Sequence, residues 1–297
     1  MRVCVAHENG VELMGELPVG IDIVVAPEPD VDVEVWVPSF LGTAPPAAAF
    51  ARLTALRVVQ LLTAGADTWV GRVPGHVTLC DARGVHTSAT AEWAVTAILA
   101  HVRDFPHFAR AQSRSEWAYR RTDELAGKRV LIVGAGSIGE GVADRLRPFE
   151  VSLTLVARRP RAGVHGVDEL PALLPAADIV VLTVPLTDAT IGLVDGDFLA
   201  AMRDGALLVN ASRGRVVDAQ ALTLELAKGR LGAALDVTDP EPLPAGDPLW
   251  QLPNVLLTPH IAASVGGVLV RAYSLVGDQL RRYAAGEPLL NVVTEGY

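Results

Sequence analysis

The stretch RVLIVGAGSIGEGVADRL, residues 129–146, decides the fold of this chain. It opens with a short apolar run, passes through three glycines, and continues as an amphipathic segment whose apolar residues recur every fourth position. In a strand–turn–helix of this kind, Gly134 permits the tight turn, Gly136 lets the backbone approach a diphosphate, and Gly139 allows close packing of helix on strand. The free N–H groups and the dipole at the helix start favour an anion there. The stretch therefore predicts a dinucleotide-binding unit.

The strand that follows this helix runs into basic residues. Within VSLTLVARRPR, residues 151–161, the strand is expected to end at Ala157, and Arg158 and Arg159 come next. Units of this kind usually place an Asp or Glu here, which hydrogen-bonds the adenosine 2′-hydroxyl. A carboxylate would repel a 2′-phosphate, whereas guanidinium groups offer it forked, charge-assisted hydrogen bonds. We therefore expect Arg158 and Arg159 to bind the 2′-phosphate of NADP(H), with NAD(H) as the alternative cofactor. Solvated turn residues are the other interpretation.

Short apolar runs recur on both sides of this unit and alternate with helical segments. The first seventy residues contain RVCVAH, IDIVVAP, VEVWVP and LRVVQLL, and the chain after residue 177 contains DIVVLTVP, GALLVNAS, GAALDV and NVLLTPHI. Such runs are typical of strands covered on both faces in a parallel sheet. The alternation restarts near residue 128, and 297 residues exceed one ordinary core. We predict an α/β fold of two Rossmann-like, doubly wound parallel-sheet domains that flank a cleft, with one long helix over residues 89–112 between them.

Composition excludes several other classes of protein. The net charge of −9 opposes a general nucleic-acid binder, which needs a basic face. The sequence has no run of about 20 apolar residues for a membrane span and no visible secretory signal. Cys4 and Cys80 lie in apolar stretches, as reduced core residues of a cytoplasmic protein do. The histidines lack the paired spacing of a metal site, so we expect no metal.

Six motifs in order resemble the D-isomer-specific 2-hydroxyacid dehydrogenase family over essentially the whole chain. They are LLTAGAD at 61–67, ATAEWAV at 89–95, GAGSIG at 134–139, VNASRGRVVD at 209–218, ALDVTDPEPLP at 234–244 and LLTPHIAASV at 256–265. The resemblance implies a substrate-binding domain of residues 1–89, completed by residues 269–297, and a dinucleotide-binding domain of residues 90–268. It also implies hinges near residues 88–92 and 266–270, and a homodimer built on the helix after residue 90.

The resemblance assigns catalysis to Arg213, Glu241 and His260. Reduction of a 2-oxo acid needs a proton on the carbonyl oxygen, and histidine titrates near neutrality, so His260 suits the proton donor and acceptor. A neighbouring carboxylate orients the ring and favours imidazolium, which is the expected role of Glu241. Arg213 is a cation for the substrate carboxylate and for charge that develops on the carbonyl oxygen. Taken singly, each residue also has an ordinary structural interpretation.

Further contacts are implied by the same resemblance. Backbone N–H groups of Gly65 and Ala66 are expected to bind the substrate carboxylate, because only backbone in a small-residue loop approaches so closely. A plain turn is the alternative for this loop. Besides the three glycines and the two arginines, the expected cofactor contacts are Ser137, Ile138, Val184, Pro185, Ala211 and Asp236, with Asp236 at the nicotinamide carboxamide.

Several features narrow the choice within the family. Phosphite-type relatives carry a lysine in the substrate loop, and this chain has no lysine before Lys128, which opposes a phosphite-type enzyme. Formate-type relatives pair the catalytic histidine with Gln, and Glu241 at that position opposes a formate-type enzyme. We expect an NADPH-dependent reductase of the glyoxylate or hydroxypyruvate type. A dinucleotide-sensing, corepressor-like binding protein and an NAD-linked, phosphoglycerate dehydrogenase-like enzyme stay open. Glu150 stands where relatives commonly have Gly, which predicts a differently built corner.

Overall fold

The computed structural model describes residues 1–40 and 42–294 and divides into two compact units. The terminal unit combines Met1–His86 with the chain from Val265 onward, and the central unit is Thr87–Ser264. The boundaries expected from the sequence lay after residues 89 and 268. The sequence predicts that the C-terminal helix returns to the first unit, and Val268–Ala285 packs in the terminal unit.

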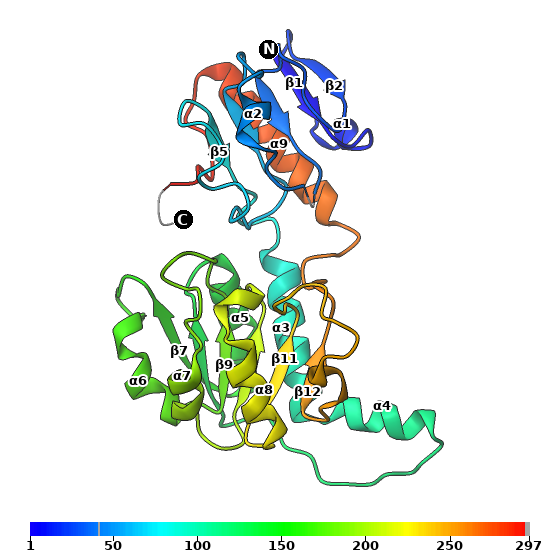
Figure 1. Cartoon of the computed structure of the whole chain (residues 1–297), viewed down its shortest axis with the longest axis vertical. Coiled ribbons are helices and arrows are strands. Elements are labelled where there is room, and N and C mark those ends of the chain that lie inside the picture. Colours follow the sequence, from blue (N-terminus) through cyan, green and yellow to red (C-terminus); the bar gives the residue numbers. More distant parts are fainter. Residues whose placement is uncertain (41, 295–297) are drawn as a thin grey trace. The chain divides into compact units, whose positions relative to one another are not determined.

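The sheet of the central unit contains seven parallel strands within the described chain, in the order β12-β11-β10-β9-β6-β7-β8 (Figure 1). The order reverses between β6 and β9, and ligands of such open sheets bind outside the carboxyl ends of the strands at that point. The strands are β6 Arg129–Val133, β7 Ser152–Ala157, β8 His165–Gly166, β9 Ile179–Leu182, β10 Leu207–Asn210, β11 Gly232–Leu235 and β12 Val255–Leu257.

Helices cover both faces of this sheet, which explains the near-continuous apolar strands. On β6, Val130 and Ile132 pack in one core with the two helices α3 and α5, whereas Leu131 and Val133 pack in the other with α6, α7 and α8. Each fully buried side chain of this size contributes about 1.5–3 kcal/mol. The helices are α3 Thr87–Val102, α5 Ser137–Leu146, α6 Leu170–Leu173, α7 Gly196–Ala201 and α8 Ala219–Ala227.

The ends of these helices follow from the sequence. The Asp218 carboxylate accepts hydrogen bonds from the first turn of α8, at 3.0 Å from the backbone nitrogens of Gln220 and Ala221, as expected of an N-cap. After α5, the short 3₁₀ turn η1 Arg147–Phe149 leads to Glu150, whose φ of 59° is left-handed. Glycine favours that conformation, so Glu150 holds a backbone shape here that a glycine would adopt without strain.

The prediction of one long helix over residues 89–112 is wrong. The helix α3 ends at Val102, and a second helix, α4 Phe105–Ser113, begins after Asp104 (Figure 1). Asp104 has a left-handed φ of 54°, which cannot continue an α-helix. Pro106 lies in the first turn of α4, where its missing N–H has no helical partner to lose.

The terminal unit is a second parallel sheet, with the order β2-β1-β3-β4-β5 in the part of the chain described. The helix α9 Val268–Ala285 and the short α1 Gly10–Leu13 contribute to a core on one face, and α2 Ala47–Phe50 contributes to the core on the other. The sequence did not predict β5 or the two-residue β8. The strands are β1 Arg2–Val5, β2 Asp22–Val25, β3 Val35–Val37, β4 Val58–Gln60 and β5 Thr78–Cys80.

The segment after α9 pairs antiparallel with β5. The backbone nitrogen of Val293 donates to Leu79 O at 2.9 Å, and that of Asp81 donates to Asn291 O at 3.1 Å. The prediction of two parallel-sheet α/β domains is thus confirmed. Cys4 and Cys80 are free and buried, as expected. Within the described residues, no helix is both long and apolar enough to span a membrane.

Candidate active site

The glycine turn joins the ends of two neighbouring strands. The backbone nitrogens of Gly134 and Ala135 donate to Val156 O on β7, at 2.8 and 3.1 Å. A Cβ at Gly134 would lie 2.7 Å from the Thr183 carbonyl carbon, and one at Gly139 would lie 1.9 Å from Gly134 O. The turn therefore closes tightly on its own backbone.

Gly136 differs from the other two glycines. A Cβ built there meets no atom of the described chain within 4 Å. The space next to it is open, and α5 begins at Ser137 directly after it. The first N–H groups of a helix favour an anion, and the missing side chain leaves room for a diphosphate to approach the backbone. This part of the site fits the dinucleotide that the sequence predicts.

The arginine loop, residues 158–161, begins where β7 ends. Arg158, Arg159 and Arg161 are all exposed. The Arg161 Nη2 donates to Ala135 O of the glycine turn at 2.7 Å and to Glu140 Oε1 on α5 at 3.0 Å. The structure therefore brings Arg161, which was not among the predicted contacts, to the glycine turn. Its signal in the sequence was only that it belongs to the same basic run.

His260 is held by the loop after β12. The carboxylate of Asp236, which is 3% exposed, accepts hydrogen bonds from Thr258 Oγ1 at 2.6 Å and from the nitrogens of Ile261 and Ala262 at 2.9 and 2.8 Å. The backbone N–H of His260 donates to the backbone carbonyl of Asp236 at 2.7 Å. Asp236 thus fixes the loop on both sides of His260, whose φ of 54° is left-handed. The expected carboxamide contact of Asp236 stays a prediction.

His260 and Glu241 meet through their side chains. The His260 Nδ1 lies 2.6 Å from Glu241 Oε1, and the two side chains are 44% and 40% exposed. Both residues lie on loops that follow carboxyl ends of strands, β11 for Glu241 and β12 for His260. A carboxylate on Nδ1 holds that nitrogen protonated, so Nε2 is left to exchange a proton with a bound molecule. The two side chains therefore lie within hydrogen-bond distance, and their catalytic roles stay a prediction.

Arg213 follows the end of β10 in a tightly bonded turn. The Asn210 Nδ2 donates to Arg213 O at 3.1 Å, and the Asn210 Oδ1 accepts from the nitrogen and hydroxyl of Ser212 at 3.0 and 2.7 Å. Arg213 Nη1 donates to Ser212 O at 2.9 Å. A Cβ at the next residue, Gly214, would lie 1.9 Å from Thr238 O. This close approach holds the arginine turn against the segment that leads to Glu241.

The remaining predicted cofactor contacts also follow strand ends in the central unit. Ala211 comes directly after β10, and its nitrogen donates to Leu182 O on β9 at 3.2 Å. Val184 and Pro185 come after β9. The neighbouring Thr183 donates through Oγ1 to Gly134 O at 2.7 Å, which ties this segment to the glycine turn. Parallel strands end at one edge of a sheet, so the predicted contacts of the central unit share that edge.

Gly65 and Ala66 belong to the terminal unit and follow the end of β4. Thr63 Oγ1 donates to Gly65 O at 2.9 Å, and Ala66 O accepts from the nitrogen of Trp69 at 2.8 Å. Trp69 is 1% exposed and packs edge-on against Trp36, with ring centroids 5.4 Å apart. Trp69 is therefore part of the core beside this loop.

Comparison with known proteins identifies the family. The sequence model for the D-isomer specific 2-hydroxyacid dehydrogenase, NAD binding domain, matches residues 95–262, more than half of the chain. The chain belongs to this family. The recognition of a nicotinamide-dependent 2-hydroxyacid dehydrogenase from six short motifs is thereby confirmed.

Relatives in the family carry several names. The chain is 35% identical over 250 residues to an uncharacterized protein in the proB 3′ region of Corynebacterium melassecola, covering 80% of this chain and 82% of that protein. It is 36% identical over 217 residues to a glyoxylate reductase of Thermofilum pendens, covering 69% and 64%. It is 34% identical over 226 residues to a D-3-phosphoglycerate dehydrogenase of Archaeoglobus fulgidus, covering 73% of this chain but only 43% of that protein.

Solved structures of 2-hydroxyacid dehydrogenases match the whole chain. A D-isomer specific 2-hydroxyacid dehydrogenase from Xanthobacter autotrophicus Py2, in complex with NADPH and MES, has 33% sequence identity and a TM-score of 0.87. The match covers 100% of this chain and 99% of that one. The two-sheet architecture of this chain is therefore that of the family.

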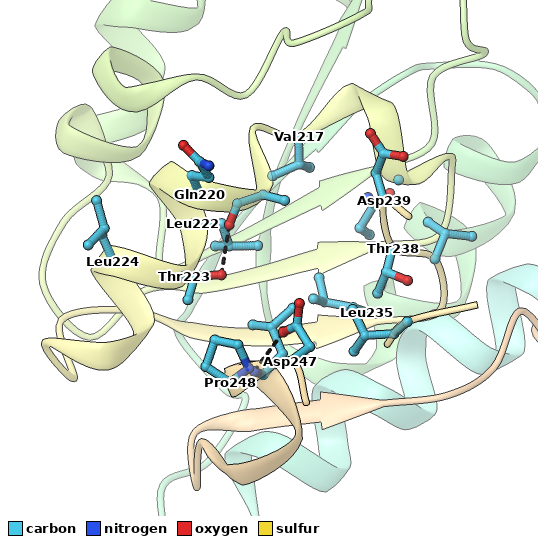
Figure 2. Close-up of a pocket in the computed structure, with 16 residues that line it drawn as sticks. Val217, Gln220, Leu222, Thr223, Leu224, Leu235, Thr238, Asp239, Asp247 and Pro248 are labelled. Atoms are coloured by element: carbon cyan, nitrogen blue, oxygen red, sulfur yellow. Dashed lines mark hydrogen bonds between the residues drawn. The ribbon is translucent and has the colours of Figure 1, made fainter. Parts of the chain in front are cut away.

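A cavity of about 510 Å³ adjoins the loop that carries Glu241 (Figure 2). It lies between α8 and the loop of residues 238–249, over the ends of β10 and β11. Leu222, Leu235 and Leu243 give it an apolar lining, and Thr238 and Asp239 border it beside Glu241. None of the predicted site residues lines this cavity, so it is separate from the proposed dehydrogenase chemistry.

The acids and histidines of this family member do not form a metal centre in the described part of the chain. Residues 1–40 and 42–294 contain no group of three or more His, Cys, Asp or Glu side chains arranged to hold a metal ion. The pairs that do occur, such as His260 with Glu241 and His165 with Glu169, consist of one histidine and one carboxylate each.

Proposed function

We propose that this chain reduces a small 2-oxo acid of the glyoxylate or hydroxypyruvate type to the D-2-hydroxy acid, with NADPH as the reductant. The observation that carries this proposal is the 2.6 Å pair of His260 Nδ1 and Glu241 Oε1, in the unit that also holds the glycine turn. A histidine paired with a carboxylate next to a dinucleotide site is the arrangement that carbonyl reduction needs.

His260 acts as the proton donor in this proposal. Glu241 accepts a hydrogen bond from Nδ1–H and orients the ring, so Nε2 carries the proton that passes to the carbonyl oxygen. Arg213 binds the substrate carboxylate and stabilises charge on that oxygen. When bound, the dihydronicotinamide supplies the hydride. In the oxidation direction, the neutral imidazole accepts the proton again.

The cofactor site is assigned to the central unit. The glycine turn with Ser137 and Ile138 would hold the diphosphate, and Arg158 and Arg159 would hold the 2′-phosphate of NADPH. The lack of an acid at Ala157 supports NADPH over NADH, because no carboxylate at the strand end competes with the phosphate. The NADPH that the Xanthobacter relative binds is consistent with this choice. Val184, Pro185, Ala211 and Asp236 are the proposed contacts further along the cofactor.

The terminal unit is assigned to the substrate, with Gly65 and Ala66 as backbone donors to its carboxylate. We further propose a homodimer that uses the region around α3 and α4. Three aromatic side chains there are well exposed, namely Phe105, Trp117 and Tyr119 at 62%, 96% and 85%. Exposed aromatic side chains are enriched at protein interfaces, which supports this region as the subunit contact.

A turnover assay tests the reaction. NADPH absorbance is followed with glyoxylate, hydroxypyruvate and larger 2-oxo acids, and NAD⁺ reduction is followed with formate and 3-phosphoglycerate. We expect oxidation of NADPH by the small 2-oxo acids. Binding of NADPH with no turnover of any compound would favour the corepressor-like alternative, and turnover of 3-phosphoglycerate with NAD⁺ would favour the phosphoglycerate dehydrogenase alternative.

His260→Gln tests the proton donor. We expect kcat to fall by about 10²–10⁴-fold while the Kd of NADPH stays unchanged, because only the proton transfer is removed. His165→Gln is the matched control, since His165 Nδ1 pairs with Glu169 Oε2 at 2.7 Å and is not among the proposed catalytic residues. Equal activity loss in both variants, or none in His260→Gln, would contradict the assignment.

A further inference from the structure

Three arginines follow β7, and Arg161, the third of them, is held through both its backbone and its guanidinium. The backbone of Arg161 is fixed, because its nitrogen donates to Val164 O at 3.0 Å and the Val164 nitrogen donates back to Arg161 O at 2.8 Å. Gly163, with a φ of +76°, lies inside this closed turn. The guanidinium is fixed as well, by the 2.7 Å hydrogen bond from Nη2 to Ala135 O. Arg161 is therefore a positioned cation.

This cation lies where β7 meets the glycine turn. Val156 O, near the end of β7, accepts hydrogen bonds from Gly134 and Ala135, and the carbonyl of Ala135 in turn accepts from Arg161. In dinucleotide-binding units the adenosine ribose lies at this junction, between the diphosphate on the turn and the end of the second strand. Arg161 is 47% exposed, so its remaining N–H groups are accessible to a ligand at that place.

Glu140 pairs with this arginine from the first turn of α5. Its Oε1 lies 3.0 Å from Arg161 Nη2, and the Glu140 side chain is 58% exposed. A carboxylate here weakens the binding of a phosphorylated cofactor in two ways. It neutralises the Arg161 guanidinium, and it places negative charge near the helix start that would receive the diphosphate.

From this geometry we propose that Arg161 is a third cation of the 2′-phosphate subsite and that Glu140 is its counter-ion, which the 2′-phosphate replaces. Ala135 O holds the guanidinium in place during the exchange, so Arg161 needs no large movement. The discrimination between NADPH and NADH then depends on Glu140 as well as on the arginines. This proposal rests on the NADPH preference proposed above.

Glu140→Gln in the full chain tests the counter-ion. Glutamine keeps the shape and an acceptor oxygen but removes the charge, so we expect the ratio of Kd for NADH to Kd for NADPH to rise about fivefold. The ratio cancels any effect on the diphosphate, which both cofactors share. Binding of 2′,5′-ADP against 5′-AMP gives the same comparison without the nicotinamide.

Asp144→Asn is the matched control. Asp144 lies one turn further along α5 and pairs with Arg147 at 3.2 Å, so the variant removes the same formal charge from the same helix. We expect the cofactor ratio to stay within about twofold of wild type. An equal rise in both variants would overturn the proposal, because it would mean that any lost negative charge produces the effect.

A double-mutant cycle tests whether Glu140 acts through Arg161. Arg161→Gln should lower the ratio about tenfold, because a charge-assisted hydrogen bond to the phosphate is lost. In that background, Glu140→Gln should no longer raise the ratio. An undiminished rise there would overturn the counter-ion role. Arg158→Ala and Arg159→Ala test the NADPH preference itself: if these variants change the ratio but Glu140→Gln does not, only the counter-ion proposal fails.

Discussion

At the residue scale, the three glycines of the turn are there for different physical reasons. The surrounding backbone leaves no room for a side chain at Gly134 or Gly139, since an added Cβ would lie 2.7 and 1.9 Å from backbone atoms. At Gly136, no atom of the described chain stands within 4 Å of the added Cβ. The first two positions therefore concern folding, and the third concerns the ligand.

Gly136→Ala and Gly139→Ala separate these reasons. We expect Gly139→Ala to lower stability by about 1–3 kcal/mol or more, because backbone must move to admit the methyl group. Gly136→Ala should unfold at the wild-type temperature yet bind NADPH and NADH about tenfold or more weakly, because the methyl group stands where the diphosphate approaches. Thermal unfolding and cofactor titration measure both. A Gly136→Ala variant with wild-type affinity would place the diphosphate elsewhere.

The residue types of the site could be predicted from sequence, but their partners could not. The motifs around Arg213, Glu241 and His260 identify the side chains, and the structure places Nδ1 of the histidine 2.6 Å from the glutamate. Asp236 and Arg161 each have contacts that no local pattern contains. Asp236 bonds a loop more than twenty residues later, and Arg161 bonds a carbonyl twenty-six residues earlier. Such pairs depend on how the strands align, which single-sequence periodicity does not specify.

At the element scale, long apolar strands were predictable and short or mixed elements were not. The runs containing β6, β9 and β10 are buried on both faces and so carry a continuous apolar signal. β5 has three residues, one of them Thr78, and lacks that signal. The break between α3 and α4 was missed although Pro106 signals it, because the apolar residues continue on both sides of the proline; the left-handed Asp104 ends α3 just before it.

The helix α9 is joined to the sheet of the terminal unit by buried polar groups. Gln279 is 2% exposed. Its Nε2 donates to Gln60 Oε1 at 2.8 Å and to Leu290 O at 2.9 Å. Its Oε1 accepts from the backbone nitrogen of Leu290 at 2.8 Å. These bonds connect α9, β4 and the segment that pairs with β5. Burial raises the pKa of the nearby Cys80 thiol to about 12, while the hydrogen bond from Gln279 lowers that pKa; losing Gln279 therefore makes this thiol more reactive only if the segment around it opens.

Gln279→Leu should therefore destabilise the terminal unit by about 2–4 kcal/mol, since it leaves buried partners unsatisfied. We expect chemical denaturation at a lower denaturant concentration. We also expect faster reaction of Cys80 with a thiol reagent at pH 8, where the wild-type thiol is protonated and buried. Gln112→Leu, at an exposed position of α4, is the control and should change neither. Unchanged thiol reactivity in Gln279→Leu would show that the three bonds do not hold this segment.

At the scale of the whole molecule, cofactor binding and substrate binding are assigned to different units. One unit is a continuous stretch of chain, and the other is formed from both ends of the chain. Every proposed cofactor contact lies within Thr87–Ser264, a single continuous piece of chain, whereas Gly65 and Ala66 lie in the unit formed from both ends of the chain. The acidic net charge of −9 is compatible with an anionic cofactor only because the basic residues gather locally, as at the end of β7. Sequence composition alone would not have revealed that concentration.

Hydrogen exchange with bound ligands tests this division. NADPH alone should slow amide exchange in the central unit, at residues 134–139 and 156–161, because those backbone groups contact or support the cofactor. Oxalate is an unreactive dicarboxylate that resembles a 2-oxo acid. If Gly65 and Ala66 donate to its carboxylate, oxalate should slow exchange at residues 63–67, and only when NADPH is also present. Gly136→Ala is the control and should show both effects much more weakly at NADPH concentrations near the wild-type Kd. Protection confined to the central unit with both ligands bound would remove the terminal unit from substrate binding, and would leave Arg213 as the remaining candidate for the carboxylate.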